Sequence, residues 1–191
     1  MADSLTDPAI DLSASPGSNL EDSLLSQLLP QAIDLYIGLG SNLEDPLQQV
    51  RQALIELGQL PCSALIRHSR LYRSDPVGPA GQPDYINAVA HLRTRLQPER
   101  MLDQLQTLER QHHRVRRQHW GARTLDLDIL VFGDQQIHTA RLSVPHPYMA
   151  ERSFVLYPLQ EIAPELRLPN GDSLTQLMAH CERGTLTPVQ V

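Results

Sequence analysis

The order of strand-like and helix-like segments is the feature that most restricts how this chain folds. Residues Ile33–Gly40 have the composition of a strand that ends at glycine. Apolar residues at a spacing of three or four then predict an amphipathic helix over 47–57, with Ser41 or Asn42 as its N-cap and Gly58 at its end. The chain therefore begins its ordered part with a strand followed by a helix.

Four further segments complete the pattern. Strand-like alternation occurs over 63–73, Tyr85–Leu92 is typical of another strand, and Pro98 is well suited to begin a second long helix. A very apolar strand follows at Thr124–Phe132. The order strand, helix, strand, strand, helix, strand predicts an α+β protein of the ferredoxin-like, split β-α-β type, with an antiparallel sheet and helices on both faces.

Charge divides the chain into two parts. Residues 1–34 hold six acidic residues and no base, whereas the rest carries 16 of each sign. We expect residues 1–31 to form an acidic, disordered N-terminal tail and residues 32–191 to form the folded domain. A 41% share of hydrophobic and a 20% share of charged residues excludes a wholly disordered chain.

The composition also limits the cellular compartment that we expect for this protein. No uninterrupted apolar run approaches the ~18 residues of a membrane span, and the acidic start does not resemble a secretory signal. Cys62 and Cys181 are too few for a disulfide framework or for a zinc site made of cysteines alone. We expect a cytoplasmic protein.

Asp126 and Asp128 are the strongest local indication of chemistry. Side chains alternate along a strand, so both carboxylates share one face, with Cα atoms about 6.6 Å apart, while Leu125, Leu127 and Ile129 face the core. A pair at this span is able to hold two magnesium ions. The alternative for an isolated pair is an ordinary solvated sheet face.

A basic segment precedes this strand. Between Arg110 and Arg123 lie five arginines, three histidines and no acid. Cations that converge with metal-binding carboxylates suit a polyphosphate, although a nucleic-acid patch or a solvated loop would have the same composition. The chain has no lysine, which excludes a Walker-type nucleotide site.

Aromatic residues form only 4% of the chain, so Tyr85 and Phe154 stand out. Each would by default belong to the core. Tyr85 and Asn87 share a strand face, and an aromatic ring beside an amide suits a flat heterocycle, which the ring stacks on and the amide hydrogen-bonds.

Several ordered motifs resemble one family. Arg114-x-Arg116 followed by Trp120–Ile129 is similar to the signature of the 6-hydroxymethyl-7,8-dihydropterin pyrophosphokinases of folate biosynthesis. Three further segments are similar as well: Tyr36–Leu43, Tyr72–Asn87 and Val144–Leu159. The resemblance covers roughly residues 33–170 in the family's order.

The resemblance implies an enzyme that transfers pyrophosphate from ATP to the pterin hydroxymethyl group and releases AMP. It implies two Mg²⁺ ions, held by Asp126 and Asp128, and a monomer with small-molecule substrates and no nucleic-acid or membrane partner. Implied catalytic residues are Arg114, Arg123, Asp126 and Asp128. Implied ATP-binding residues are Gln106, Glu109, Arg116, Trp120, Ile129, His146 and Arg152. Implied pterin-binding residues are Ser74, Asp75, Val77, Tyr85, Asn87 and Phe154.

Two alternatives are weaker. An RNA-binding ferredoxin-like domain would use exposed aromatics on a basic sheet, but Asp126 and Asp128 would repel phosphates there in the absence of metal. An inactive, nucleotide-binding relative is disfavoured because the aspartate and arginine pairs are retained. The motif does depart from the family pattern, with His119 where arginine is common and Ala122 where proline is usual.

Overall fold

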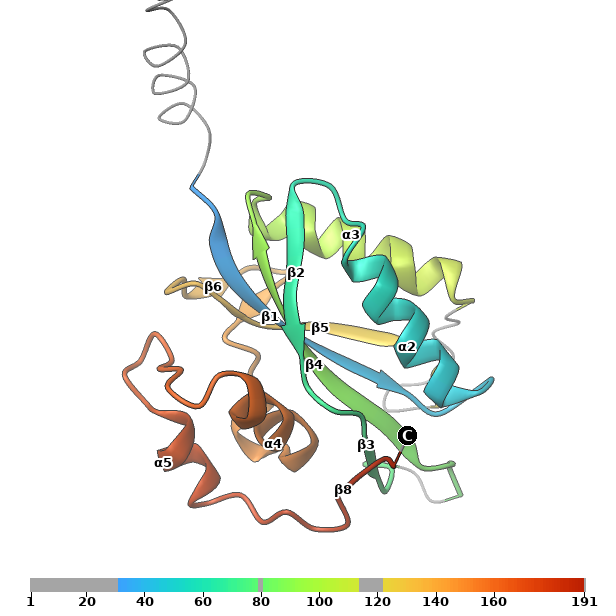
Figure 1. Cartoon of the computed structure of the whole chain (residues 1–191). Coiled ribbons are helices and arrows are strands. Elements are labelled where there is room, and N and C mark those ends of the chain that lie inside the picture. The colour runs from blue at the N-terminus through green and yellow to red at the C-terminus, as the bar shows by residue number, and fades with distance from the viewer. Residues whose placement is uncertain (1–30, 79–80, 114–121, 191) are drawn as a thin grey trace, which may run out of the picture. The chain divides into compact units, whose positions relative to one another are not determined.

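The computed structural model describes residues 31–78, 81–113 and 122–190, and six strands of these residues form one antiparallel sheet (Figure 1). Across the sheet the strands follow one another in the order β5, β1, β4, β3 and β8. Strand β2 pairs with β4 on the same edge as β3, which is the edge that faces away from β1. The strands are β1 (Ile33–Ser41), β2 (Ser63–His68), β3 (Tyr72–Ser74), β4 (Tyr85–Thr94), β5 (Asp126–Phe132) and β8 (Thr187–Pro188).

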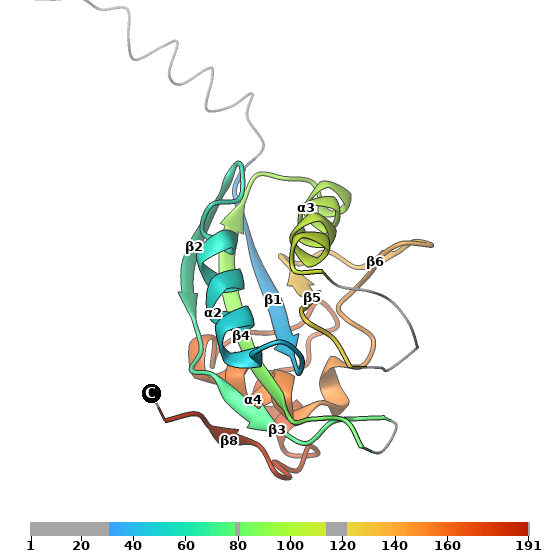
Figure 2. The same ribbon diagram turned by 90° about the vertical axis from the view of Figure 1, so that its right-hand side faces the viewer.

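Helices α2 (Pro46–Leu57) and α3 (Pro98–Gln111) cover one face of the sheet (Figure 2). Alternate residues of β1, among them Leu35 and Ile37, are fully buried against the apolar sides of these helices. Pro98 begins α3 as predicted, because a helix's first turn has no use for the N–H that proline lacks.

The opposite face carries a second core. The short turn η1 (Met149–Glu151) leads into α4 (Ser153–Ile162), and α5 (Leu174–Met178) packs beside α4. Their apolar residues bury Tyr36 and Val89. A small hairpin, β6 (Ile137–His138) with β7 (Ser143–Val144), connects β5 to this layer. Helices thus lie on both faces of an antiparallel sheet, and the predicted fold class is confirmed (Figure 1).

The predicted cap of the first helix is wrong. Ser41 is the last residue of β1, and the N-cap of α2 is Asp45, whose carboxylate accepts the backbone N–H of Gln48 at 3.4 Å. Asp45 has a φ of 60°, a left-handed conformation that aspartate tolerates better than most residues. The chain therefore makes a turn between strand and helix that spacing alone did not indicate.

The predicted strand over 63–73 is two strands. Ser69 separates them: its N–H donates to the carbonyl of Val89 at 2.9 Å, and its hydroxyl accepts the N–H of the same residue at 3.0 Å. The side chain thereby replaces one ladder bond with β4 while the backbone turns. β2 also contains an irregularity, because the register shifts between Leu65 and Arg67 and Ile66 has no opposite residue on β4.

The C-terminal segment closes the edge beside β3. β8 pairs with β3, with Pro188 opposite Tyr72, and the N–H of Val189 donates to the carbonyl of Leu71 at 2.8 Å. Residues 1–30, the main part of the predicted tail, lie outside the described residues, so the domain boundary stays a prediction. No helix in the described part of the chain is long and apolar enough to cross a membrane.

Candidate active site

Strands β1 and β5 bring the two predicted metal ligands to one face. Asp126 lies opposite Gly40 and Asp128 opposite Gly38 in the antiparallel register. A Cβ at Gly40 would approach the Asn87 amide oxygen at 3.5 Å, and one at Gly38 would lie 3.3 Å from the Leu130 side chain. The two glycines therefore keep the floor beside the carboxylates open.

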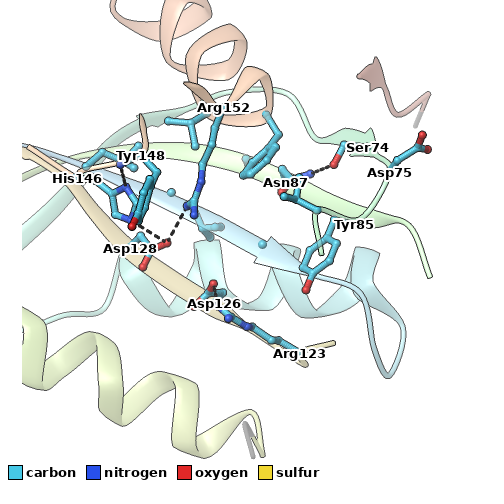
Figure 3. A pocket seen from close by; sticks show the side chains of 18 residues that line it. Ser74, Asp75, Tyr85, Asn87, Arg123, Asp126, Asp128, His146, Tyr148 and Arg152 are labelled. Atoms are coloured by element: carbon cyan, nitrogen blue, oxygen red, sulfur yellow. Dashed lines mark hydrogen bonds and ion pairs between the residues drawn. The ribbon is translucent and has the colours of Figure 1, made fainter. Parts of the chain in front are cut away.

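Two cavities meet at these carboxylates. The first, of about 270 Å³, lies between the sheet and the start of α4 (Figure 3). The second, of about 310 Å³, lies between α3, β5 and the segment around β7. Both are lined by the same four residues, which are Arg123, Asp126, Asp128 and His146. The acidic pair thus borders both spaces.

The first cavity is lined by all six residues predicted to bind the pterin: Ser74, Asp75, Val77, Tyr85, Asn87 and Phe154. Asn87 is 3% exposed, and its amide nitrogen donates to the Ser74 hydroxyl at 2.9 Å (Figure 3). This bond fixes which end of the amide faces β3. Tyr85 and Phe154 come from β4 and α4 respectively, so two aromatic rings border the cavity from different layers.

The wall of the first cavity is supported by the C-terminal segment. The N–H of Asp75 donates to the hydroxyl of Thr185 at 3.2 Å, just before β8 begins. Together with the pairing of β8 to β3, this contact holds the segment that carries Ser74 and Asp75 against the sheet.

The second cavity is lined by Gln106, Glu109 and Ile129, which were predicted to bind ATP. Glu109 is only 4% exposed, and its carboxylate accepts the N–H of Leu127 at 2.9 Å, so it also joins α3 to β5. Arg141 and Ser143, which were not predicted, line this cavity as well. No local pattern distinguished them from other surface residues.

Two arginines and one histidine face the two aspartates. The guanidinium of Arg123 pairs with Asp126, while His146 Nε2 and Arg152 Nη1 lie 3.8 and 4.0 Å from Asp128 Oδ2. Burial alone would lower the pKa of Arg123, but the charges of Asp126, Tyr85 and Asp128, together with the hydrogen bond to Asp126, outweigh burial and raise that pKa. Burial and the neighbouring Arg152 lower the pKa of His146 to about 4, so its imidazole is neutral at pH 7.

The carboxylate pair fits a magnesium site of the kind that substrate completes. In the described residues no group of three or more histidine, cysteine or acidic side chains gathers in a way that could hold a metal ion by itself. Mg²⁺ commonly takes one or two carboxylates and fills its other positions with water and phosphate oxygens. Asp126 and Asp128 supply such oxygens beside both cavities.

Asn42, which the sequence places in the family-like segment Tyr36–Leu43 and predicts as a candidate helix cap, is a buried connecting residue. Its backbone N–H donates to the carbonyl of Arg123 at 3.0 Å, and its side-chain oxygen accepts the N–H of Arg123 at 2.7 Å. Its amide nitrogen donates to the carbonyl of Pro83 at 3.1 Å. Asn42 therefore joins the segment before β5 to the segment before β4.

Three predicted residues lie outside the described residues: Arg114, Arg116 and Trp120. Arg152, predicted on the ATP side, lines the first cavity and approaches Asp128 from α4's N-terminal end (Figure 3). The described residues thus bring the predicted pterin residues together, and they bring Gln106, Glu109 and Ile129 together on the other side of the acidic pair.

Comparison with known proteins identifies one family. Residues 36–164 match the family model described as 7,8-dihydro-6-hydroxymethylpterin-pyrophosphokinase (HPPK). A 2-amino-4-hydroxy-6-hydroxymethyldihydropteridine pyrophosphokinase of Pseudomonas aeruginosa is 52% identical over 136 residues, which are 71% of this chain and 84% of that protein. The enzyme of the same name from Haemophilus influenzae is 49% identical over 133 residues, or 70% of this chain and 83% of its own length.

Solved structures show the same fold at much lower sequence identity. Wild-type Plasmodium falciparum HPPK-DHPS has a TM-score of 0.63 and 14% identity to this chain; the match covers 80% of this chain and 45% of that longer one. The fold, the matched family model and the two close relatives lead to one conclusion: this chain belongs to the 7,8-dihydro-6-hydroxymethylpterin-pyrophosphokinase family.

Proposed function

We propose that this protein transfers pyrophosphate from ATP to the hydroxymethyl group of 6-hydroxymethyl-7,8-dihydropterin, with release of AMP, as a step of folate biosynthesis. The observation that supports this most is the pair of cavities that share Asp126, Asp128 and Arg123. Transfer between two bound molecules requires each to have its own space and both to reach one charged centre.

The first cavity suits the pterin. Tyr85 and Phe154 offer aromatic faces for a flat ring, and Asn87, held by Ser74, offers polar atoms to its edge. Asp75 and Val77 would contribute backbone groups. Because Asn87 is almost fully buried, a heterocycle that satisfies its amide would be strongly preferred over one that does not.

The second cavity suits ATP. In this proposal Gln106, Glu109 and Ile129 border the nucleoside, and His146 and Arg152 face the phosphates beside Asp128. Arg116 and Trp120 would complete the nucleotide site. His146 is neutral at pH 7 and so would act there as a hydrogen-bond donor.

Asp126 and Asp128 would hold magnesium, and we expect two ions to bind there. Bound there, the metal would neutralise phosphate charge and so favour attack at phosphorus. Arg123, already paired with Asp126, and Arg114 would stabilise charge that develops on the transferred group.

The chemical step is an in-line displacement. The pterin hydroxyl oxygen forms a bond to the β-phosphorus, the bond from that phosphorus to the oxygen bridging the α-phosphate breaks, and AMP leaves with the electron pair. The hydroxyl proton passes to a base, for which Asp126 is our candidate. Positioning by the two cavities would supply much of the acceleration.

An RNA-binding role finds less support in the described residues. Such a domain needs exposed aromatics on its central strands. Tyr36 on β1 is 8% exposed and packs into the core beneath α4, and Tyr85 borders a cavity instead of an open sheet.

AMP release from ATP and 6-hydroxymethyl-7,8-dihydropterin tests the proposal directly. We expect Asp126→Ala and Asp128→Ala each to reduce transfer by at least about a hundredfold, which is about 2.7 kcal/mol of barrier, with little change in melting temperature. Asp134→Asn is the matched control, because this exposed aspartate follows the far end of β5. Turnover within about tenfold of wild type in both alanine variants would rule out the metal assignment.

A further inference from the structure

The guanidinium of Arg152 lies between two aromatic rings. Its Cζ is 5.4 Å from the ring centre of Tyr148 and 5.7 Å from that of Phe154. At the same time its Nη1 lies 4.0 Å from Asp128 Oδ2. Figure 3 shows Arg152 reaching into the first cavity with Tyr148 on one side and Asn87 on the other. The cation is thus held at the edge of the acidic pair.

Tyr148 also orients the neighbouring imidazole. Its backbone N–H donates to His146 Nδ1 at 3.2 Å, so Nδ1 is an acceptor and the ring proton belongs on Nε2. Nε2 is the atom that faces Asp128 Oδ2 at 3.8 Å. Tyr148 therefore contacts both the arginine and the histidine that approach Asp128.

Core packing does not account for the position of the Tyr148 ring. The residue is 50% exposed, in contrast to Met149, which follows it and is buried. Long arginine side chains lose conformational freedom when they bind phosphate, and a ring that stacks on the guanidinium reduces that loss by ordering it beforehand. The face of a tyrosine ring attracts such a cation.

We propose that Tyr148 is a positioning residue for pyrophosphate transfer. Its ring holds the Arg152 guanidinium at the place where the phosphates of the nucleotide bind. This inference rests on the proposed placing of ATP beside Asp128. The ring is the part of Tyr148 that contacts Arg152. The ring acts on the nucleotide through Arg152, whereas the contact with His146 Nδ1 comes from the backbone N–H and does not depend on the side chain.

The test compares Tyr148→Phe, which keeps the ring, with Tyr148→Leu, which removes it. We expect Tyr148→Leu to raise the KM for ATP, and the Kd of an unreactive ATP analogue with magnesium, about two- to fivefold. The KM for the pterin and kcat should change less than twofold. Tyr148→Phe should match wild type in all four quantities. This split distinguishes positioning of the nucleotide from general loss of structure.

An Arg152→Gln background tests whether Tyr148 acts through the arginine. In that background Tyr148→Leu should have no further effect on analogue binding. Tyr157→Leu is the matched control, because the Tyr157 ring also stacks under an arginine, Arg183 at 5.6 Å, but borders neither cavity. It should leave both KM values unchanged.

Three results would overturn the inference: unchanged analogue binding in Tyr148→Leu, equal losses in Tyr148→Phe and Tyr148→Leu, or a full Tyr148→Leu effect in the Arg152→Gln background. The second of these would assign the effect to the hydroxyl. Failure of the proposed function is seen separately, as a wild-type protein that binds the analogue but releases no AMP.

Discussion

Asn42 illustrates how much one uncharged side chain organises at this site. It is 1% exposed, and its hydrogen bonds satisfy backbone groups of Arg123 on one side and Pro83 on the other. Arg123 pairs with Asp126, so the position of Asn42 is transmitted to the acidic pair by one short segment. The segment ending at Pro83 leads directly into Tyr85 on β4.

We expect Asn42→Ala to lower kcat/KM for transfer at least tenfold and to destabilise the fold by about 1–3 kcal/mol, because buried backbone groups lose their partners. Steady-state kinetics and denaturant unfolding measure the two effects. Asn170→Ala is the control, since this exposed asparagine bonds only locally to Asp172. An Asn42→Ala enzyme with wild-type kcat/KM would show that Arg123 keeps its place without this support.

At the scale of single residues, the sequence predicted those site members that follow strand alternation. Asp126 with Asp128, and Tyr85 with Asn87, share faces because every second side chain does. Asn42 and Tyr148 were missed as site residues. Their contacts join segments distant in sequence or depend on the path of a turn, and neither has a periodic pattern or a charge to mark it.

At the scale of helices and strands, a polar network joins α4 to the segment of β3. Glu161 on α4 accepts the Tyr72 hydroxyl at 2.6 Å, and it accepts the backbone N–H and Nε of Arg70 at 3.1 and 3.2 Å. Burial alone would raise the pKa of Glu161, but the hydrogen bonds from Tyr72 and Arg70 outweigh it and hold that pKa below its usual value. The folded chain therefore favours the ionised carboxylate.

This network predicts a pH-dependent contribution to stability. Because the folded pKa of Glu161 is lowered, its contribution is complete above the ordinary glutamate pKa of about 4.3 and is lost as pH falls through the folded value. We expect Glu161→Gln to lower the free energy of unfolding by about 1 kcal/mol at pH 7, and by progressively less below about pH 4. Denaturant unfolding over a pH series measures this. A difference that grows on acidification would contradict the assignment.

The elements themselves were largely predictable, and their ends were not. Periodicity and Pro98 indicated α3, and runs of strand-forming residues indicated β1, β4 and β5. The division of 63–73 depends on Ser69 bonding to β4, which is a contact between distant segments. β8 was not predicted either, because a two-residue strand has no pattern of its own and exists through its pairing with β3.

For the whole molecule, the matched family region and both cavities lie after residue 32. We expect a chain without residues 1–31 to keep its transfer activity within about twofold, because none of the removed residues belongs to the matched family region or to the described residues that line the two cavities. Kinetics and melting temperatures of the full-length and shortened proteins make the comparison. A large fall in kcat in a shortened protein that still melts cooperatively would assign the tail a part in catalysis.

The irregularity in β2 also bears on how copies of the protein behave toward one another. In the described residues, β2 hydrogen-bonds to a strand on one side only, and a regular outer strand of this kind would be a template for intermolecular sheet extension. The extra residue Ile66 interrupts the regular spacing of the outward N–H and C=O groups of β2. The exposed Arg67 beside Ile66 adds a charge. A strand of another molecule would be unable to form a regular hydrogen-bond ladder with β2 and would meet a charged side chain there. The bulge therefore disfavours edge-to-edge aggregation.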